Sequence, residues 1–266
     1  MLAPREAAGK GHGTGNLPGP FSNNMSEDLH PHAIKASAIG FGALFLMVAL
    51  NWLAIHFGLV TIPPNTVPWK PPKLDARPGM FVHWQMQSML HDKQSCLSAL
   101  DHANELRYAP LNDTNTAQGC GFSDVVRLDR TPVAFNTSPE VTCSLAAALY
   151  WWQRDLQTIA AFELHTTITR IDQEGSYACR NVNNAAFGPR SEHATANAID
   201  IDAFETADGR RIAVAKDWNK PTPEGRFLRA AHDSACTVFG EVLGPDYNSL
   251  HAAHFHLDEA AWTMCR

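Results

Sequence analysis

The sequence predicts an α+β domain, with a small and mainly antiparallel sheet and flanking helices, preceded by one transmembrane helix. Stretches with strand and helix periodicity are mixed without the regular strand–helix alternation of a parallel α/β fold. Residues 36–60 contain no Asp, Glu, Lys or Arg. The 266 residues are enough for one buried core with appendages, so length alone does not require a second domain.

The N-terminal part is predicted to contain a tail and a membrane helix. Residues 1–35 are rich in Gly, Pro, Asn, Ser and His, so we expect a disordered cytoplasmic tail. A helix over residues 36–60, rising about 1.5 Å per residue, is long enough to cross a hydrocarbon core of about 30 Å. A cleaved signal peptide and a buried core helix are the alternatives. No small-x-small cleavage pattern follows Leu50, which favours an uncleaved single-pass anchor.

Residues 61–80 hold six prolines, which favours an extended polyproline spacer between the membrane and the domain. The basic residues around the apolar segment are Lys35 before it and Lys70, Lys73 and Arg77 after it. By the positive-inside rule this distribution places the C-terminal part in the cytoplasm. The cysteines favour the opposite orientation, with the C-terminal part outside the cytoplasm.

All the cysteines follow the apolar segment, and their number is even. None forms a C-x-x-C pair, which suits three disulfides in an oxidising compartment better than a structural zinc cluster. We therefore expect an inner-membrane protein with a periplasmic C-terminal domain. Six cysteines allow 15 pairings, and the sequence does not choose among them. The six are Cys96, Cys120, Cys143, Cys179, Cys236 and Cys265.

The domain of residues 81–266 begins with a helical stretch over 85–106. Short β-branched runs at 125–128 and 133–135 predict strands. A helix over 142–156 follows, because Leu145, Leu149, Trp152 and Leu156 recur at helical spacing. Such an apolar stripe packs against a core far more often than it binds a ligand.

The second half continues with short elements. Apolar or alternating runs predict strands, and the amphipathic stretch near the end predicts a helix. The predicted strands are 168–171, 196–201, 211–214 and 254–257, and the predicted helix is 227–243. The formal net charge of −6 argues against a broad phosphate-binding surface, so nucleic acid is not an expected partner.

Two segments concentrate the residues that carry chemistry, Ser191–Asp200 and His251–His256. His254 and His256 are two apart on the last predicted strand, so both side chains leave one face of it, and Asp258 continues that face. Asp200 lies in an apolar alternating run, where a carboxylate is costly to bury unless a metal or cation holds it.

Catalytic zinc takes three protein ligands from His, Asp or Glu and leaves a position for water. His193, Asp200 and His256 supply that set for one Zn²⁺, and His254 is placed to act as a general base. Each motif alone is more often structural, but their co-occurrence favours a metal site. The remaining histidines that lack such neighbours are expected on the surface or in the core: His83, His91, His102, His165 and His232.

Other hydrolytic chemistries fit less well. The sequence has no Gly-x-Ser-x-Gly elbow, and disulfides explain the cysteines better than a nucleophile does. A glycosidase would draw its carboxylates from Glu192, Asp200 and Asp202, but this assignment leaves the clustered histidines without a role.

The stretch from Cys96 to Arg266 resembles the bacterial extensin-like C-terminal domain family. The resemblance is carried by five short segments: 175–180 (GSYACR), 191–195 (SEHAT), 243–248 (LGPDYN), 254–258 (HFHLD) and the final Cys265-Arg266. The zinc pattern is in turn similar to the LAS metallopeptidases, which include D-alanyl-D-alanine carboxypeptidases and dipeptidases and penicillin-insensitive murein endopeptidases.

This resemblance implies that His193, Asp200 and His256 are ligands and that Ser191 helps to bind substrate. It also implies that Arg180 neutralises an oxyanion or a substrate carboxylate. We expect His251 and Asp258 to lie behind the ligands and to support them without binding the metal.

Two departures from the pattern occur. His254 stands where the carboxypeptidase branch has a Glu base, as in the endopeptidase branch, and Ala196 replaces the usual Gly, which adds a methyl group beside the groove.

The expected function is that of a membrane-anchored zinc peptidase acting on peptidoglycan stem peptides or cross-links. The alternative is a non-catalytic wall-binding module that keeps the metal as a structural element. The cleaved bond and the oligomeric state do not follow from the sequence.

Overall fold

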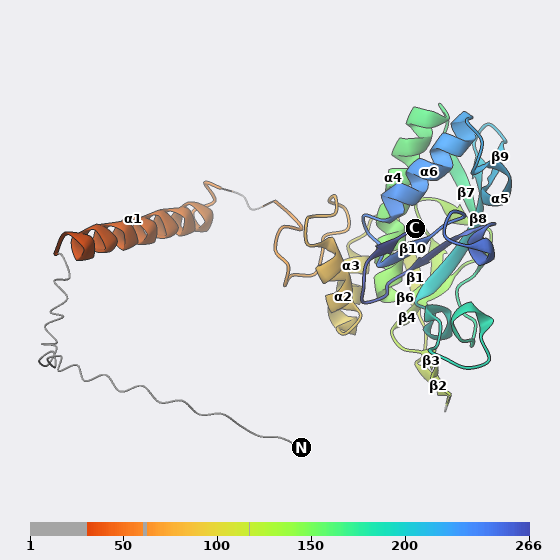
Figure 1. The fold of residues 1–266 in the computed structure, drawn as a ribbon, viewed down its shortest axis with the longest axis horizontal. Coiled ribbons are helices and arrows are strands. Elements are labelled where there is room, and N and C mark those ends of the chain that lie inside the picture. The colour runs from red at the N-terminus through yellow and green to blue at the C-terminus, as the bar shows by residue number, and fades with distance from the viewer. Residues whose placement is uncertain (1–30, 61–62, 117) are drawn as a thin grey trace, which may run out of the picture. The chain divides into compact units, whose positions relative to one another are not determined.

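The computed structural model describes residues 31–60, 63–116 and 118–266, so most of the predicted tail lies outside the described residues. The chain divides into two units, residues 1–61 and 62–266. The first contains helix α1 (Pro31–His56), which covers most of the predicted membrane span (Figure 1). Within the described residues, no helix combines the length and the apolar character needed to cross a membrane. The span over residues 36–60 stays a prediction.

The second unit is a mixed α+β domain, as the sequence predicts. Its helices are α2 (Val82–Met89), α3 (Lys93–Asp101), α4 (Cys143–Glu163), α5 (Val214–Asp217) and α6 (Pro223–Ala235), with short 3₁₀ turns η1 (Val182–Asn184), η2 (Glu192–Thr195) and η3 (Ser249–His251). Its strands are β1 (Arg107–Pro110), β2 (Thr114–Thr116), β3 (Cys120–Phe122), β4 (Val125–Arg130), β5 (Ala134–Phe135), β6 (Glu140–Thr142), β7 (Ile168–Gly175), β8 (Ala198–Thr206), β9 (Arg211–Ala213), β10 (Glu241–Leu243), β11 (Phe255–Asp258) and β12 (Met264–Cys265).

The central sheet has the strand order β12-β10-β11-β8-β7-β5, and β9 pairs with β8. Its inner pairs β10·β11, β11·β8 and β7·β8 are antiparallel, whereas the outer strands β12 and β5 pair in parallel. Two smaller sheets, β1-β4-β6 and β2-β3, are antiparallel. The predicted antiparallel character is therefore confirmed, and two short parallel pairs at the ends of the sheet are added to it.

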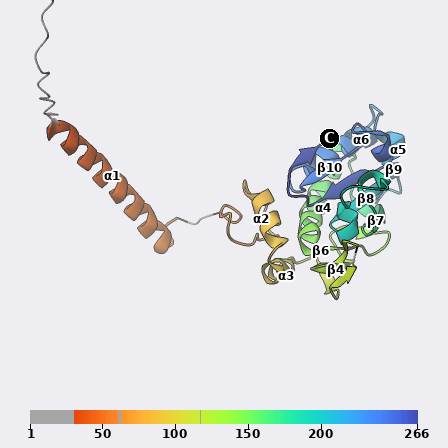
Figure 2. The ribbon, with the colours of Figure 1, turned by 60° about the horizontal axis from the view of Figure 1, so that its bottom comes forward.

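Helix α4 is the centre of the core and runs along the sheet with α6 beside it (Figures 1 and 2). Thr142 caps α4 by accepting a hydrogen bond from the backbone N–H of Leu145. Trp152 is fully buried, and its ring meets those of Phe204 on β8 and Phe239 at centroid distances of 6.0 Å. The Leu and Trp stripe of α4 is thus core, as the sequence predicts.

Two predicted helices end earlier than their periodicity indicates. The stretch 85–106 contains α2 and α3, and between them Asp92 caps α3 by accepting from the backbone N–H of Ser95. The stretch 227–243 is helical only to Ala235 and finishes as strand β10. Gly240 precedes this strand, and a Cβ atom there would lie 2.4 Å from the Ala260 carbonyl oxygen. The close approach of Gly240 to the segment after β11, and the pairing of β10 with β11, therefore prevail over the helical pattern.

The proline-rich segment differs from the expected spacer, because residues 63–80 lie against the domain. Leu74 is fully buried. The indole N–H of Trp151 lies 2.8 Å from each of the carbonyl oxygens of Leu74 and Ala76, and Arg154 donates to the carbonyl of Asp75. A proline-rich segment has carbonyl acceptors without internal partners, and α4 supplies the donors. Composition predicted the extended backbone but not this docking.

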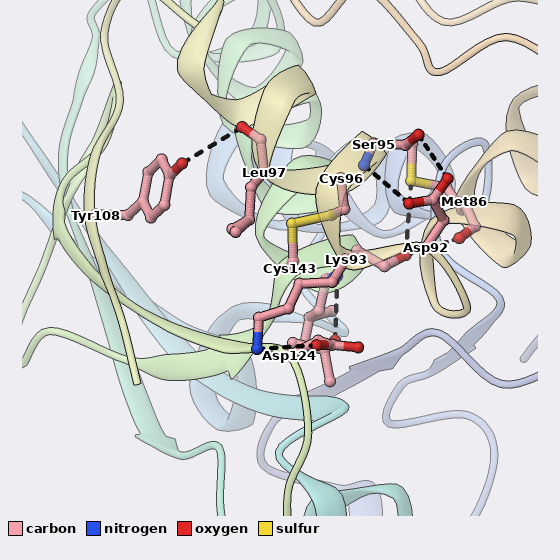
Figure 3. The surroundings of a disulfide bond; sticks show 12 residues. Met86, Asp92, Lys93, Ser95, Cys96, Leu97, Tyr108, Asp124 and Cys143 are labelled. Carbon is pink, nitrogen blue, oxygen red and sulfur yellow. Dashed lines mark hydrogen bonds and ion pairs between the residues drawn. A yellow bond between two sulfur atoms is a disulfide. The ribbon is translucent and has the colours of Figure 1, made fainter. Parts of the chain in front are cut away.

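The six cysteines form three disulfides, which confirms the predicted number and selects one of the 15 pairings. Cys96–Cys143 joins α3 to the start of α4, next to an ion pair between Lys93 and Asp124 (Figure 3). Cys120–Cys179 joins the β2–β3 hairpin to the segment after β7, and Cys236–Cys265 joins the end of α6 to β12. The loop of 47 residues closed by Cys96–Cys143 corresponds to roughly 4 kcal/mol of chain entropy.

Thiol labelling of the denatured chain checks this pairing state. We expect no reactive thiol before reduction and six after it, because every cysteine is bridged. Six reactive thiols in protein prepared without reductant would contradict both the disulfides and the oxidising compartment.

Glu259 is a buried carboxyl group at the end of β11. Its side chain is enclosed, and among the described residues neither of its carboxylate oxygens has a hydrogen-bond partner. Burial, and then the charge of Asp258, raises the pKa of Glu259 well above its ordinary value. The folded chain therefore keeps the proton that the unfolded chain loses above about pH 4.5. Stability should fall as pH rises from 4.5 toward the folded-state pKa.

Replacing Glu259 with methionine is expected to raise the free energy of unfolding at pH 8 by about 1–3 kcal/mol, because an unpaired polar group leaves the core. It should also flatten the dependence of stability on pH above 4.5. Urea denaturation at pH 5 and pH 8 measures both effects. A variant that is less stable at pH 8, with an unchanged pH slope, would show that the carboxyl group is satisfied in the fold.

Candidate metal centre

The three predicted ligands come from neighbouring elements of the central sheet. Asp200 on β8 and His256 on β11 are paired directly across the antiparallel ladder, so their side chains share one face. His193 lies in η2, the turn that leads into β8. Ser191 caps this turn, and Ala196 ends it in the left-handed conformation with φ 56°. This reversal folds His193 back over the start of β8.

The ligand atoms form a small triangle. His193 Nε2 lies 3.2 Å from His256 Nδ1 and 3.2 Å from Asp200 Oδ2, and His256 Nδ1 lies 3.0 Å from Asp200 Oδ1. Tetrahedral zinc with bonds of 2.0–2.1 Å separates neighbouring ligand atoms by roughly 3.3 Å. The triangle therefore has nearly the size that one zinc ion requires, and these three residues are a group whose donor atoms can share an ion.

The other nitrogen of each histidine faces an oxygen atom. His193 Nδ1 is 3.3 Å from the backbone carbonyl oxygen of Ser176, and His256 Nε2 is 3.1 Å from Asp258 Oδ2. An acceptor at the remote nitrogen fixes the tautomer that presents a lone pair to a metal. Asp258 thus supports His256 from the side away from the triangle, and the carbonyl of Ser176 supports His193 in the same way.

The environment of the three predicted ligands favours an ionised Asp200 and a positively charged His256. Burial alone would lower the pKa of His256, but the hydrogen bonds and charges of Asp200 and Asp258 outweigh it and raise that pKa to about 9. Burial opposes the ionised form of Asp200, yet its hydrogen bonds to His193 and His256 hold its pKa well below the ordinary value. A buried carboxylate under two imidazoles is therefore compensated either by protons on the rings or by a metal ion.

The predicted base, His254, lies beside the triangle and outside it. Its Nε2 is 3.7 Å from Asp200 Oδ1, and its Nδ1 is 3.9 Å from Glu174 Oε2. His251 packs against both His254 and His256, with ring centroids at 5.4 and 5.8 Å. Burial, followed by the charges of these two rings, lowers the pKa of His251 to about 4, so its ring is neutral near pH 7.

A pocket of about 330 Å³ opens on His256 and contains the remaining predicted site residues, Arg180, Ser191 and His251. Arg180 lines this pocket and so places a positively charged residue at its wall. The pocket also contains Glu192 and Glu241, which the zinc assignment does not use. Burial, with the charge of Asp258, raises the pKa of both glutamates.

Of the carboxylates named for a glycosidase, Glu192 lines the pocket and Asp200 belongs to the triangle, whereas Asp202 lies outside both. Asp202 forms an ion pair with Arg211 at 3.0 Å and does not line the pocket, while Glu192 accepts a hydrogen bond from the side-chain amide of Asn197. Ala196 is fully buried and is not part of the pocket lining, so its methyl group lies away from the cavity.

Sequence reasoning missed several groups around the site. The carbonyl of Ser176 has no side-chain signature, and Glu174, Glu241 and Trp262 belong to no motif with His193 or His256. The strand 241–243 has the sequence Glu-Val-Leu, too short a run to stand out from the predicted helix over 227–243.

Comparison with known proteins identifies the C-terminal part. The family model described as extensin-like protein C-terminus matches residues 94–266, about two thirds of the chain, and this range includes every residue of the candidate site. Searches of curated proteins and of solved structures found no match. The chain therefore belongs to the extensin-like protein C-terminus family.

Proposed function

We propose that this protein is a zinc-dependent peptidase that hydrolyses peptide bonds in peptidoglycan stem peptides or cross-links. The observation that carries the proposal is the triangle of His193, Asp200 and His256 with an acceptor behind each imidazole. An acceptor behind each ligating imidazole is the arrangement usual for histidine ligands of a metal ion, whose tautomer and orientation it fixes.

The order of site residues along the chain supports a relation to the LAS metallopeptidases. Ser191-x-His193-x₆-Asp200 precedes His254-x-His256, and the two segments meet on one face of the antiparallel sheet. The position of His254 two residues before the last ligand favours the murein endopeptidase branch over the carboxypeptidase branch.

The chemistry follows from the residues present. A zinc ion held by His193, Asp200 and His256 would supply a Lewis acid and a water of lowered pKa at neutral pH. His254, with Glu174 at its other nitrogen, is within reach to accept a proton near the cluster and to return it to the leaving amine. Arg180 lines the same cavity, and a guanidinium is suited to hold a substrate carboxylate or a developing negative charge.

For the location of the protein, we propose that residues 36–60 anchor the chain in the inner membrane with the domain in the periplasm. The three disulfides suit an oxidising compartment. The large apolar side chains of α1 are exposed along its described length, with Phe41 at 73% and Phe45 at 75%. Such a surface is stable in lipid and unfavourable in water.

Digestion of purified peptidoglycan by the full-length protein tests the peptidase proposal. We expect new soluble peptides with zinc-loaded protein, their loss after chelation and their return when zinc is added. The competing function is a wall-binding module that keeps zinc as a structural element. Sedimentation with peptidoglycan without release of peptides, together with unfolding on chelation, would favour that module over the enzyme.

A further inference from the structure

The pocket beside His256 is lined by charged residues that have no role in the proposed zinc site. Glu241, His256 and Asp258 offer donor atoms that all lie within 4.8 Å of one another. Glu192 lines the same cavity, so three carboxylates surround a volume of about 330 Å³. The cavity also holds Arg180 and the ring of Trp262 on its wall, which makes it a shaped pocket with charges of both signs.

A second metal ion does not satisfy these carboxylates. Asp258 Oδ2 is paired with His256 Nε2 at 3.1 Å, and Asp258 Oδ1 accepts from the backbone N–H of Ala260 at 2.9 Å. His256 directs its Nδ1 to the zinc triangle, so its Nε2 carries the proton that Asp258 accepts. Glu241 and Glu192 remain, and each already accepts a hydrogen bond, from the Trp262 indole and from the Asn197 amide. Two such carboxylates are too few for a protein metal site.

The remaining lone pairs suit a cation that donates hydrogen bonds. Trp262 donates its indole N–H to Glu241 Oε2 at 3.1 Å and so fixes this carboxylate at the wall of the pocket. The Trp262 side chain remains 62% exposed, which leaves ring surface for a ligand cation. An ammonium group gains both from a carboxylate and from an aromatic face within about 6 Å.

We infer that this pocket binds a substrate residue carrying a free primary ammonium group, with Glu241 as its acceptor, Trp262 as its aromatic wall and Arg180 holding a nearby carboxylate. The inference rests on the proposed function in naming the ligand as a peptide. It specifies the substrate class further: a peptide with a diamino-acid side chain whose amine is not acylated, next to a free carboxylate.

Two probe peptides that differ only in this charge test the inference. The probes are Nα-acetyl-L-lysyl-D-alanine, with a free side-chain ammonium, and its Nα,Nε-diacetyl counterpart. Isothermal titration is carried out on the zinc-loaded full-length chain with His254→Ala, so that neither peptide is consumed. We expect the free amine to bind roughly 10- to 100-fold more tightly, the range of one hydrogen bond to a charged group.

Variants of the pocket complete the test. In E241Q the preference for the free amine should disappear, and in W262A it should fall several-fold. E140Q is the matched control, because Glu140 lies on β6 and does not line the pocket, and it should keep the full preference. Equal affinity of the two probes, undetectable binding of both, or a preference that survives in E241Q would overturn the inference.

Metal analysis and turnover separate this inference from the proposed function. Two zinc ions per chain, one of them lost in E241Q, would show a second metal site and overturn the ammonium assignment. Wild-type protein that hydrolyses both peptides equally would retain the peptidase and exclude the ammonium subsite. Discrimination in binding without hydrolysis of any peptidoglycan would support the subsite and contradict the peptidase.

Discussion

Replacing His193 with alanine is expected to reduce bound zinc from about one ion per chain to none after dialysis, and to abolish peptide release from peptidoglycan. Structural zinc sites with four ligands bind with apparent free energies of about 10–16 kcal/mol. If the ligands share this equally, each accounts for ~3–4 kcal/mol, or roughly a 10²- to 10³-fold change in affinity. His193 provides one corner of the triangle at 3.2 Å from both other ligand atoms, and no other described side chain replaces it.

Elemental analysis of the dialysed protein measures this effect directly, and a zinc-chelator competition assay gives the affinity. His91→Ala is the matched control, because His91 is exposed and lies outside the cluster. It should keep one zinc ion. A full zinc complement in His193→Ala would exclude this triangle as the metal site. Absence of zinc from the wild-type chain would favour protonated imidazoles as the compensating charge.

Asp258→Asn is expected to weaken zinc binding less than His193→Ala does. Its carboxylate contacts His256 Nε2 at 3.1 Å and does not belong to the triangle, so its loss weakens a supporting contact and leaves all three ligands in place. We expect zinc affinity to fall by about 10- to 100-fold, the usual cost of removing an outer-shell partner. An effect as large as that of His193→Ala would indicate that Asp258 itself holds the ion.

The sequence predicted those site residues that stand in a recognisable local sequence pattern. Asp200 stands out because a carboxylate inside an apolar strand needs compensation, and His254 and His256 share a face because strand periodicity is two. His193 reaches Asp200 because the turn η2 reverses at Ala196, and Asp200 meets His256 because β8 and β11 are neighbours. Antiparallel pairing of those two strands supplied that contact.

The parts that sequence missed depend on tertiary pairing. The amphipathic pattern over 227–243 contains both a helix and a strand, and the choice was made by β10 pairing with β11 and β12. That pairing is what brings Glu241 next to Asp258. In the same way, the prolines of residues 63–80 predicted an extended backbone, but the burial of Leu74 depends on donors from α4 that are about 77 residues away in the chain.

His254→Ala is expected to lower kcat for peptide hydrolysis by about 10²- to 10⁴-fold, the contribution usual for a general acid–base group, while the chain keeps its zinc. The reason for the second expectation is geometric. His254 Nε2 lies 3.7 Å from Asp200 Oδ1, and His254 is not among the three residues whose donor atoms converge. KM should change little, because Arg180 and the carboxylates of the pocket remain in place.

The measurement combines zinc content, kcat and the pH profile, and this combination distinguishes a proton-transfer residue from a positioning one. A general base gives the wild-type profile an acidic limb that disappears in His254→Ala. Glu174→Gln is the companion variant, since Glu174 Oε2 lies 3.9 Å from His254 Nδ1 and Glu174 is not among the converging ligands, so this variant should keep its zinc. Full activity in His254→Ala would contradict this assignment and favour His251 as the base. The neutral ring of His251 packs against His254, and His251 lines the pocket.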